Sequence, residues 1–246
     1  MGNKNLVVIL SHCNDEEKLK VLENFKWGKS TEGYKDTVGR EIFEQKIYET
    51  TLPVENGDII FDAGSSTGIF GYSVLDKKPS KIYCVNPSIE EMQTCKLNIP
   101  SDIGVYLNYG ISGVDGEIEL GDVYENTDGD NRSSSKFRVK RFKTIIEENN
   151  IEKIDFLKTD CEGGEYDIFN VENLFWIKDN VKKMVGEWHL NTPETKQQFR
   201  EFRDVFLRVF PNHEVYSVDG INIKWDLWNE HFIEFYNEVI IHIDNR

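Results

Sequence analysis

Short apolar runs alternate with helical segments along the chain from residue 55 onward, and this alternation limits the folds that the chain can adopt. The runs at 58–61, 81–85 and 154–159 have the length of buried strands, and a segment of helical character follows each of them. Strands that alternate with helices form a parallel sheet, and helices then cover both faces of that sheet. We therefore predict an α/β fold with a mostly parallel sheet.

The end of the chain departs from this alternation. Two apolar runs, at 214–218 and 238–243, follow one another closely and predict one antiparallel strand near the C-terminus. Ser88 and Thr192 are the expected N-caps of two helices, the second with Pro193 in its first turn. The other predicted strands are at 105–109, 117–120, 137–140 and 183–187, and the predicted helices are at 68–75, 88–97, 142–149, 165–175 and 192–209.

The first fifty residues precede the regular pattern. We predict a strand at 5–10, a helix at 15–25 and a second helix at about 37–50. These elements suggest an N-terminal cap, so we divide the chain into a strand and helix extension at 1–50 and one domain at 51–246. A length of 246 residues suits one large domain better than two.

The charge balance excludes two classes of partner. The chain has 29 Lys and Arg residues against 44 Asp and Glu residues, a net charge of −15. A groove that binds nucleic acid needs a surplus of basic residues, and so does a protein surface that binds an anionic membrane. We therefore expect neither nucleic acid nor a membrane as a partner, and no oligomeric state is predicted.

Apolar runs and cysteines bear on the compartment. The apolar run at 6–10 is too short for a transmembrane helix or for the core of a signal peptide. The four cysteines are scattered and form no C-x-x-C pair, so we interpret them as free thiols in a reducing compartment. The predicted location is therefore cytoplasmic.

A loop rich in glycine and serine follows the apolar run at 58–61 and is the most informative motif. It reads Asp-Ala-Gly-Ser-Ser-Thr-Gly, a D-x-G-x-x-x-G pattern that allows a tight turn and offers backbone N–H groups to a ligand. The middle glycine of G-x-G-x-x-G loops is absent, which leaves less room for a pyrophosphate and favours S-adenosylmethionine over NAD. The alternative is a turn that binds nothing. The candidate cofactor-binding residues are Asp62, Gly64, Ser65, Ser66 and Gly68.

The next strand ends at Asn86, where a nucleoside-binding sheet normally has an acidic residue for the ribose hydroxyls. An amide can accept a hydrogen bond from a hydroxyl, but the bond lacks the assistance of a charge. We therefore count Asn86 among the cofactor-binding candidates. The alternative is that Asn86-Pro87 simply marks a turn.

Carboxylates gather where the predicted strand at 154–159 ends. Asp160, Glu162 and Glu165 surround a pair of glycines. Neighbouring carboxylates repel one another and suit a general base, a cation site or a clamp on a hydroxyl group. The alternative is a helix start whose acidic residues complement the helix dipole.

These motifs together resemble the FkbM family of S-adenosylmethionine-dependent methyltransferases. The family's Asp-x-Gly-Ala-Asn-x-Gly loop is similar to 62–68, and its Glu-Pro dipeptide is similar to Asn86-Pro87. Its Leu-Lys-Ile-Asp-x-Glu-Gly-x-Glu motif is matched nearly residue for residue by 157–165, and its Glu-x-His by 187–189. The resemblance covers about residues 40–190.

The resemblance implies a Rossmann-like methyltransferase sheet of seven strands and a methyl transfer to a hydroxyl group. The acceptor would be a sugar, a glycan or another small molecule, and S-adenosylmethionine would be the cofactor. We assign 51–246 as a methyltransferase-like domain and name no metal-ligating residues, and whether a metal assists the reaction stays open. The candidate proton acceptors are Asp160, His189 and Glu162, and the candidate substrate-binding residues are Glu165 and Glu187.

Two other functions stay open at this point. A binding protein could keep the methyltransferase fold without catalysis, and the departure at Asn86 is consistent with that. An NAD-dependent sugar enzyme could use a related sheet, although both the missing middle glycine and the missing acidic ribose residue count against it. Fold by itself does not decide among these functions.

Overall fold

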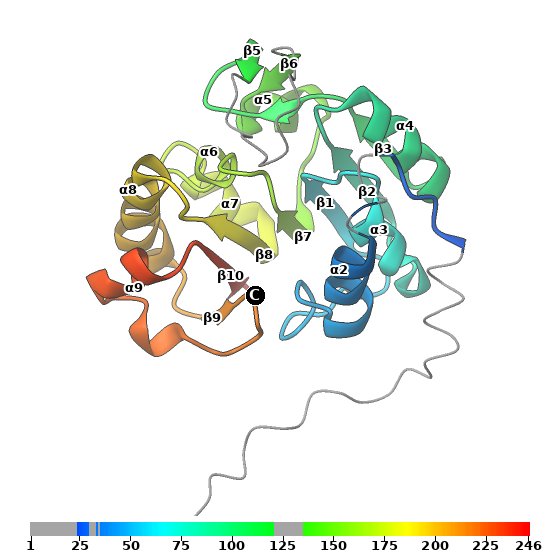
Figure 1. The fold of residues 1–246 in the computed structure, drawn as a ribbon. Helices are drawn as coiled ribbons and strands as arrows, with labels where there is room; N and C mark the ends of the chain where they lie inside the picture. The colour runs from blue at the N-terminus through cyan, green and yellow to red at the C-terminus, as the bar shows by residue number, and fades with distance from the viewer. Residues whose placement is uncertain (1–23, 30–32, 34, 121–134) are drawn as a thin grey trace, which may run out of the picture.

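The computed structural model describes residues 24–29, 33, 35–120 and 135–246. The predicted strand at 5–10 and nearly all of the predicted helix at 15–25 lie outside these residues. The main sheet has seven strands in the order β3-β2-β1-β7-β8-β10-β9 (Figure 1). These strands are β1 (Ile59–Ala63), β2 (Lys81–Val85), β3 (Gly104–Leu107), β7 (Ile154–Thr159), β8 (Val181–His189), β9 (His213–Ser217) and β10 (Glu238–Asp244).

The directions of the strands follow the predicted scheme. Strands β3, β2, β1, β7 and β8 pair in parallel, whereas β10 is antiparallel to both of its neighbours, β8 and β9. This confirms the prediction of a Rossmann-like, mostly parallel sheet with an antiparallel strand near the C-terminus. Because parallel strands point the same way, β1, β2, β7 and β8 present their carboxyl ends at one edge of the sheet, where open α/β sheets bind ligands.

Helices cover both faces of this sheet, as Figure 1 shows. Side chains of successive strand residues point to opposite faces, so Phe61 and Leu157 belong to one apolar cluster while Ile60 and Phe156 belong to the other. The first cluster includes side chains from α5 (Phe142–Glu148), α6 (Glu165–Ile168), α7 (Leu174–Asn180), α8 (Pro193–Glu201) and α9 (Glu230–Phe235), and the second from α2 (Lys35–Gly39), α3 (Ile69–Ser73) and α4 (Ile89–Asn98).

None of the helices in the described part of the chain combines the length and the apolar character that a membrane span requires.

The predicted helix starts are confirmed. The Ser88 hydroxyl accepts a hydrogen bond from the Glu91 N–H at 3.2 Å at the start of α4. Thr192 and Thr195 form a reciprocal capping box at the start of α8, with Pro193 in the first turn. Such caps satisfy N–H groups that have no partner within the helix. Shorter helical turns are η3 (Leu75–Lys77), η4 (Phe202–Phe206), η5 (Leu207–Val209) and η6 (Lys224–Asp226).

The prediction of one helix at 165–175 is wrong, because α6 ends at Ile168 and α7 begins at Leu174. Two asparagines between them take over backbone hydrogen bonds. The Asn173 amide donates to the Ile168 carbonyl at 3.0 Å, and the Asn170 side-chain oxygen accepts from the Asn173 N–H at 3.2 Å. Asparagine side chains compete with the helical backbone in this way and so interrupt the helix.

A second, smaller sheet lies beside the main one. Its strands are in the order β4-β6-β5, with β4 at Gly110–Ile111, β5 at Gly116–Leu120 and β6 at Ser135–Lys140. The antiparallel pairing of β5 with β6 confirms the predicted hairpin at 117–120 and 137–140. Residues 121–134 between these strands lie outside the described part of the chain.

The described part of the first fifty residues packs on the main sheet. The predicted helix at 37–50 is shorter than expected, because α2 continues only as a π-helical turn η2 (Arg40–Gln45) and Lys46 then adopts a left-handed φ of 51°. Phe25, Ile42 and Phe43 are buried in the same apolar cluster as strand residues of the sheet. The boundary at residue 50 stays a prediction, and the described residues on either side of it share one core.

A buried ion pair connects β8 with the segment that leads into β1. Lys183 is only 1% exposed, and its ammonium donates to Asp58 Oδ2 at 2.7 Å and to the Pro53 carbonyl at 2.9 Å. Removal of one partner from such a pair leaves a buried charge without compensation, which costs more than the pair contributes.

We expect Lys183→Met to lower the free energy of unfolding by about 3–5 kcal/mol, because it leaves the buried Asp58 carboxylate without its counter-ion. The double variant Lys183→Met/Asp58→Asn should recover a large part of this loss. Urea unfolding followed by circular dichroism measures both. A double variant no more stable than the single one would show that the loss comes from packing and not from charge.

Candidate functional site

A cavity of about 370 Å³ lies at the carboxyl ends of β1, β2, β7 and β8. Its lining comes from three parts of the chain: the N-terminal segment, the loop after β1, and the ends of the other strands. The lining residues include most of the predicted cofactor loop and three predicted carboxylates. They are Trp27, Val38, Glu41, Ile42, Tyr48, Gly64, Ser65, Ser66, Thr67, Ile69, Phe70, Asn86, Glu91, Lys158, Asp160, Glu162 and Glu187.

The motif at 62–68, which forms the end of β1 and the loop after it, needs glycine at its third position. Gly64 has a φ of 76°, and a Cβ atom there would come within 1.7 Å of the Asp160 carbonyl oxygen. Its N–H donates to the Val85 carbonyl at 3.0 Å, which attaches the loop to the end of β2. Ser66 also has a positive φ, 47°, a conformation that is strained for any residue other than glycine. The loop is thus held against two neighbouring strands.

Asp62 lies beneath this loop and does not line the cavity. Its side chain is fully buried, and Oδ1 pairs with the Lys158 ammonium at 3.2 Å. Burial raises the pKa of Asp62, and the charge of Lys158 opposes that rise. Lys158 also donates to the Gly64 carbonyl at 2.9 Å. Sequence reasoning missed Lys158 as a site residue, although a lysine inside the apolar run at 154–159 was the available signal.

Asp160 faces the cavity and is held by two residues that we did not predict. The Tyr48 hydroxyl donates to Asp160 Oδ2 at 3.1 Å, and the Lys158 ammonium lies 3.8 Å from the same oxygen. Burial and the charge of Asp160 raise the pKa of Tyr48 well above its usual range, so the phenol stays protonated and can donate. Tyr48 comes from the N-terminal segment, and no local pattern marked it.

His189 and Glu165 form a buried pair behind the cavity. Glu165 is fully buried and accepts from the His189 ring Nδ1 at 2.8 Å and from the Gly163 N–H at 2.9 Å. On its other side, His189 Nε2 lies 3.4 Å from Glu162 Oε2. Burial alone would lower the pKa of His189, but the hydrogen bond and charge of Glu165, with the charge of Glu162, raise it to about 10. The imidazole is therefore cationic at neutral pH.

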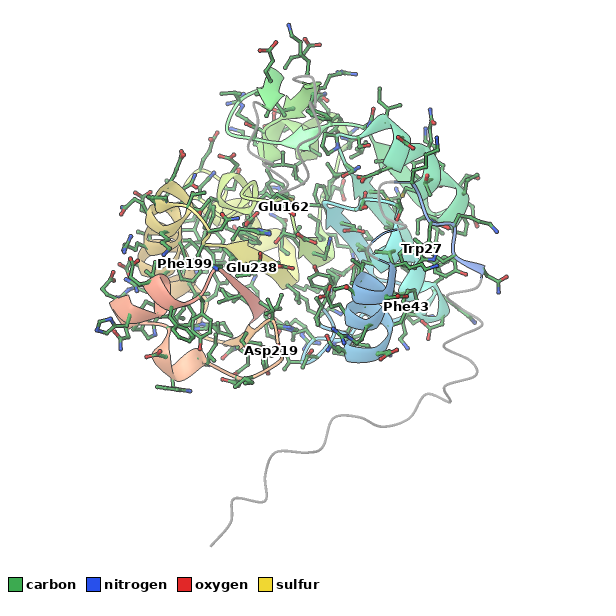
Figure 2. All side chains as sticks on the ribbon, viewed as in Figure 1. Trp27, Phe43, Glu162, Phe199, Asp219 and Glu238 are labelled. Carbon is green, nitrogen blue, oxygen red and sulfur yellow. The ribbon has the colours of Figure 1, made fainter. Side chains whose placement is uncertain are left out.

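Further carboxylates complete the rim. Burial, with the added charge of Asp160, raises the pKa of Glu187 to about 8, and burial likewise raises the pKa of Glu41. Figure 2 shows Glu162 and Glu238 near the centre of the molecule, with Trp27 on the side of α2 and α3.

Two groups of side chains could each offer a metal ion three ligand atoms that lie within 4.8 Å of one another. One group is Asp160, Glu162 and His189, and the other is Glu187, His189 and Glu238.

The structure therefore gathers most of the predicted site residues at one cavity. Gly64, Ser65, Ser66, Asn86, Asp160, Glu162 and Glu187 line it, whereas Asp62, Gly68, Glu165 and His189 do not. Gly68 instead allows α3 to pack on α4, because a Cβ atom there would come within 2.9 Å of Cys95 Sγ. Glu165 is fully buried and its oxygens accept from His189 and Gly163, and its predicted contact with substrate stays a prediction.

Comparison with known proteins gives a family for this arrangement. A family model described as a methyltransferase FkbM domain matches residues 55–216, more than half of the chain. No curated protein matches the chain.

Three solved structures of low identity are similar in fold. Methyltransferase FkbM from Methylobacillus flagellatus KT is 12% identical with a TM-score of 0.49, over 94% of this chain and 58% of that one, so this chain spans little more than half of its length. Fibrillarin from Aeropyrum pernix, solved with natively bound S-adenosyl-L-methionine, is 14% identical with a TM-score of 0.42, over 81% and 71%. Precorrin 8W decarboxylase from Methanobacterium thermoautotrophicum is 15% identical with a TM-score of 0.40, over 77% and 82%.

The raised pKa of Glu187 predicts a pH dependence of stability. Because the pKa is about 8 in the folded state and 4.5 ordinarily, the unfolded chain loses this proton first, and stability falls as pH rises from 4.5 to 8. We expect Glu187→Gln to remove this loss and to raise the melting temperature at pH 8.5 by roughly 2–8 °C, as about 1–2 kcal/mol would. At pH 4.5 the two proteins should melt alike.

Thermal melts between pH 4.5 and 9 test this prediction, with Glu44→Gln as the control at an exposed carboxylate outside the cavity. Parallel curves for wild type and Glu187→Gln would show that Glu187 ionises in its ordinary range.

Proposed function

The chain belongs to the FkbM methyltransferase family, and we propose that it transfers a methyl group from S-adenosylmethionine to a hydroxyl group of a sugar or another small molecule. The observation that carries the proposal is the cavity at the strand ends, where the glycine loop faces the Asp160 carboxylate that Tyr48 and Lys158 hold.

The compartment is a separate part of the proposal. The cysteines of the described residues, Cys84, Cys95 and Cys161, are free thiols, which supports a cytoplasmic location.

The loop after β1 fits this cofactor. Gly64 keeps the backbone open where any side chain would collide with Asp160. The Ser65 hydroxyl belongs to the cavity lining, is buried and has no hydrogen-bond partner among the described residues, so its oxygen could accept from an amino group of the cofactor. We propose that Gly64, Ser65 and Ser66 hold the cofactor, with Asp62 beneath them. When bound, the cofactor's sulfonium supplies a methyl group that needs no further activation.

Asp160 is the proton acceptor that we propose. Tyr48 and Lys158 hold one of its oxygens, and the carboxylate faces the cavity, where an acceptor hydroxyl would have to lie. His189 is less suited to this role, because its raised pKa keeps it protonated at neutral pH. We assign His189 instead to the positioning of Glu162, with which it forms an ion pair.

The charge of the cavity supports a neutral acceptor. Its described lining residues include the carboxyl groups of Glu41, Glu91, Asp160, Glu162 and Glu187, and Lys158 is the cation among them. Phosphorylated acceptors such as nucleotide sugars would meet like charge, whereas hydroxyl groups of an uncharged sugar can donate hydrogen bonds to carboxylates. An uncharged polyhydroxyl compound is therefore the acceptor class that we favour.

Calorimetric titration with S-adenosylmethionine, with NAD⁺ run alongside, tests the proposal. We expect micromolar binding of the sulfonium cofactor and no binding of NAD⁺. Absence of cofactor binding in a folded protein would instead favour a binding protein that has kept the fold. Transfer of a labelled methyl group to a panel of methyl glycosides then tests the acceptor class.

We expect Asp160→Asn to lower the rate of labelled methyl transfer at least about 100-fold, as loss of a general base does. The dissociation constant of the cofactor should change by less than about threefold, because Asn keeps an oxygen that can accept from Tyr48. Asp219→Asn, at an exposed position between β9 and η6, is the control. Turnover that survives in Asp160→Asn would reject Asp160 as the proton acceptor.

A further inference from the structure

The backbone at the end of β2 is fixed from both sides. The Val85 carbonyl accepts from the Gly64 N–H at 3.0 Å, which joins it to the cofactor loop. The Asn108 side chain donates to the carbonyls of Asn86 and Pro87 at 3.0 and 3.1 Å, which joins it to the end of β3. The Asn86 side chain therefore leaves a rigid segment, and its direction is set before any ligand binds.

That side chain meets a carboxylate. Asn86 is 7% exposed, and its amide nitrogen donates to Glu91 Oε2 at 2.8 Å. Glu91 lies in the first turn of α4, where its own N–H is capped by Ser88. Both Asn86 and Glu91 line the cavity. A carboxylate is thus present at the carboxyl end of β2, although the strand itself ends in an amide.

In nucleoside-binding sheets an acidic residue at this edge accepts hydrogen bonds from the ribose hydroxyls. We infer that Glu91 performs this task here and that Asn86 is a positioning residue that holds it; the inference rests on the proposed function. A carboxylate has about four acceptor positions on its two oxygens, so one carboxylate can accept from Asn86 and from ribose hydroxyls together. In this chain the acidic group lies on the helix that follows β2, and the Asn86 amide donates a hydrogen bond to it.

Calorimetric titration with S-adenosylhomocysteine tests this inference without turnover. We expect Glu91→Gln to weaken binding about tenfold, because it exchanges a charge-assisted hydrogen bond for a neutral one. Glu90→Gln removes the same charge from the same helical turn at an exposed position and should bind within about twofold of wild type. Thermal melts verify that each variant is folded.

A second ligand separates contact from a structural effect. The 2′,3′-dideoxy analogue of S-adenosylhomocysteine lacks the hydroxyls that Glu91 would bind. Wild type should prefer the parent ligand about tenfold or more, and Glu91→Gln should show a clearly smaller preference. An equal preference in both proteins would overturn the inference, and so would unchanged affinity in Glu91→Gln.

The exchange variant Asn86→Asp/Glu91→Gln tests the role of Asn86. It returns the carboxylate to the strand end and places the amide on α4, so it should regain binding to within about threefold of wild type. Affinity as weak as that of Glu91→Gln would overturn the pairing of the two residues. If wild type itself fails to bind S-adenosylhomocysteine, the proposed function falls and the inference with it, whereas the other outcomes leave the proposed function intact.

Discussion

One buried ammonium group joins the parts from which the cavity is made. Lys158 Nζ lies within 3.2 Å of Asp62, donates to the Gly64 carbonyl and lies 3.8 Å from Asp160. It also lies 5.2 Å from the centre of the Tyr48 ring. Burial of a charge is costly unless partners surround it, so the loop after β1, the end of β7 and the N-terminal segment must come together for the lysine to be accommodated.

The electrostatics of the site follow from this arrangement. Lys158 and the protonated His189 are cations beside a larger number of carboxylates, and Glu187 is held partly neutral by burial and by the charge of Asp160. A sulfonium ion adds positive charge where the protein has an excess of negative charge. The same excess disfavours anionic acceptors, and it is consistent with a net charge of −15 for the whole chain.

Much of the fold and of the candidate site could be predicted from the sequence, because the sequence signals for them are local. The apolar runs marked the seven strands of the main sheet, and the caps at Ser88 and Thr192 marked two helix starts. The helix predicted at 165–175 failed because two asparagines compete for its backbone, a detail that apolar periodicity does not show. The predicted cofactor loop and the carboxylates after β7 do meet at one cavity, since parallel strands bring their carboxyl ends to one edge.

The sequence by itself thus determined the sheet, its cofactor loop and the position of the carboxylates, because each depends on residues that are neighbours in the chain or on the rules of parallel sheets. Only the tertiary structure decided which groups act on one another. Tyr48 reaches Asp160 across 112 positions, Glu165 reaches the ring of His189 across 24, and the Asn86 amide donates to Glu91 on the following helix. Such contacts depend on how rigid elements pack in space, and no period or motif along the chain records them.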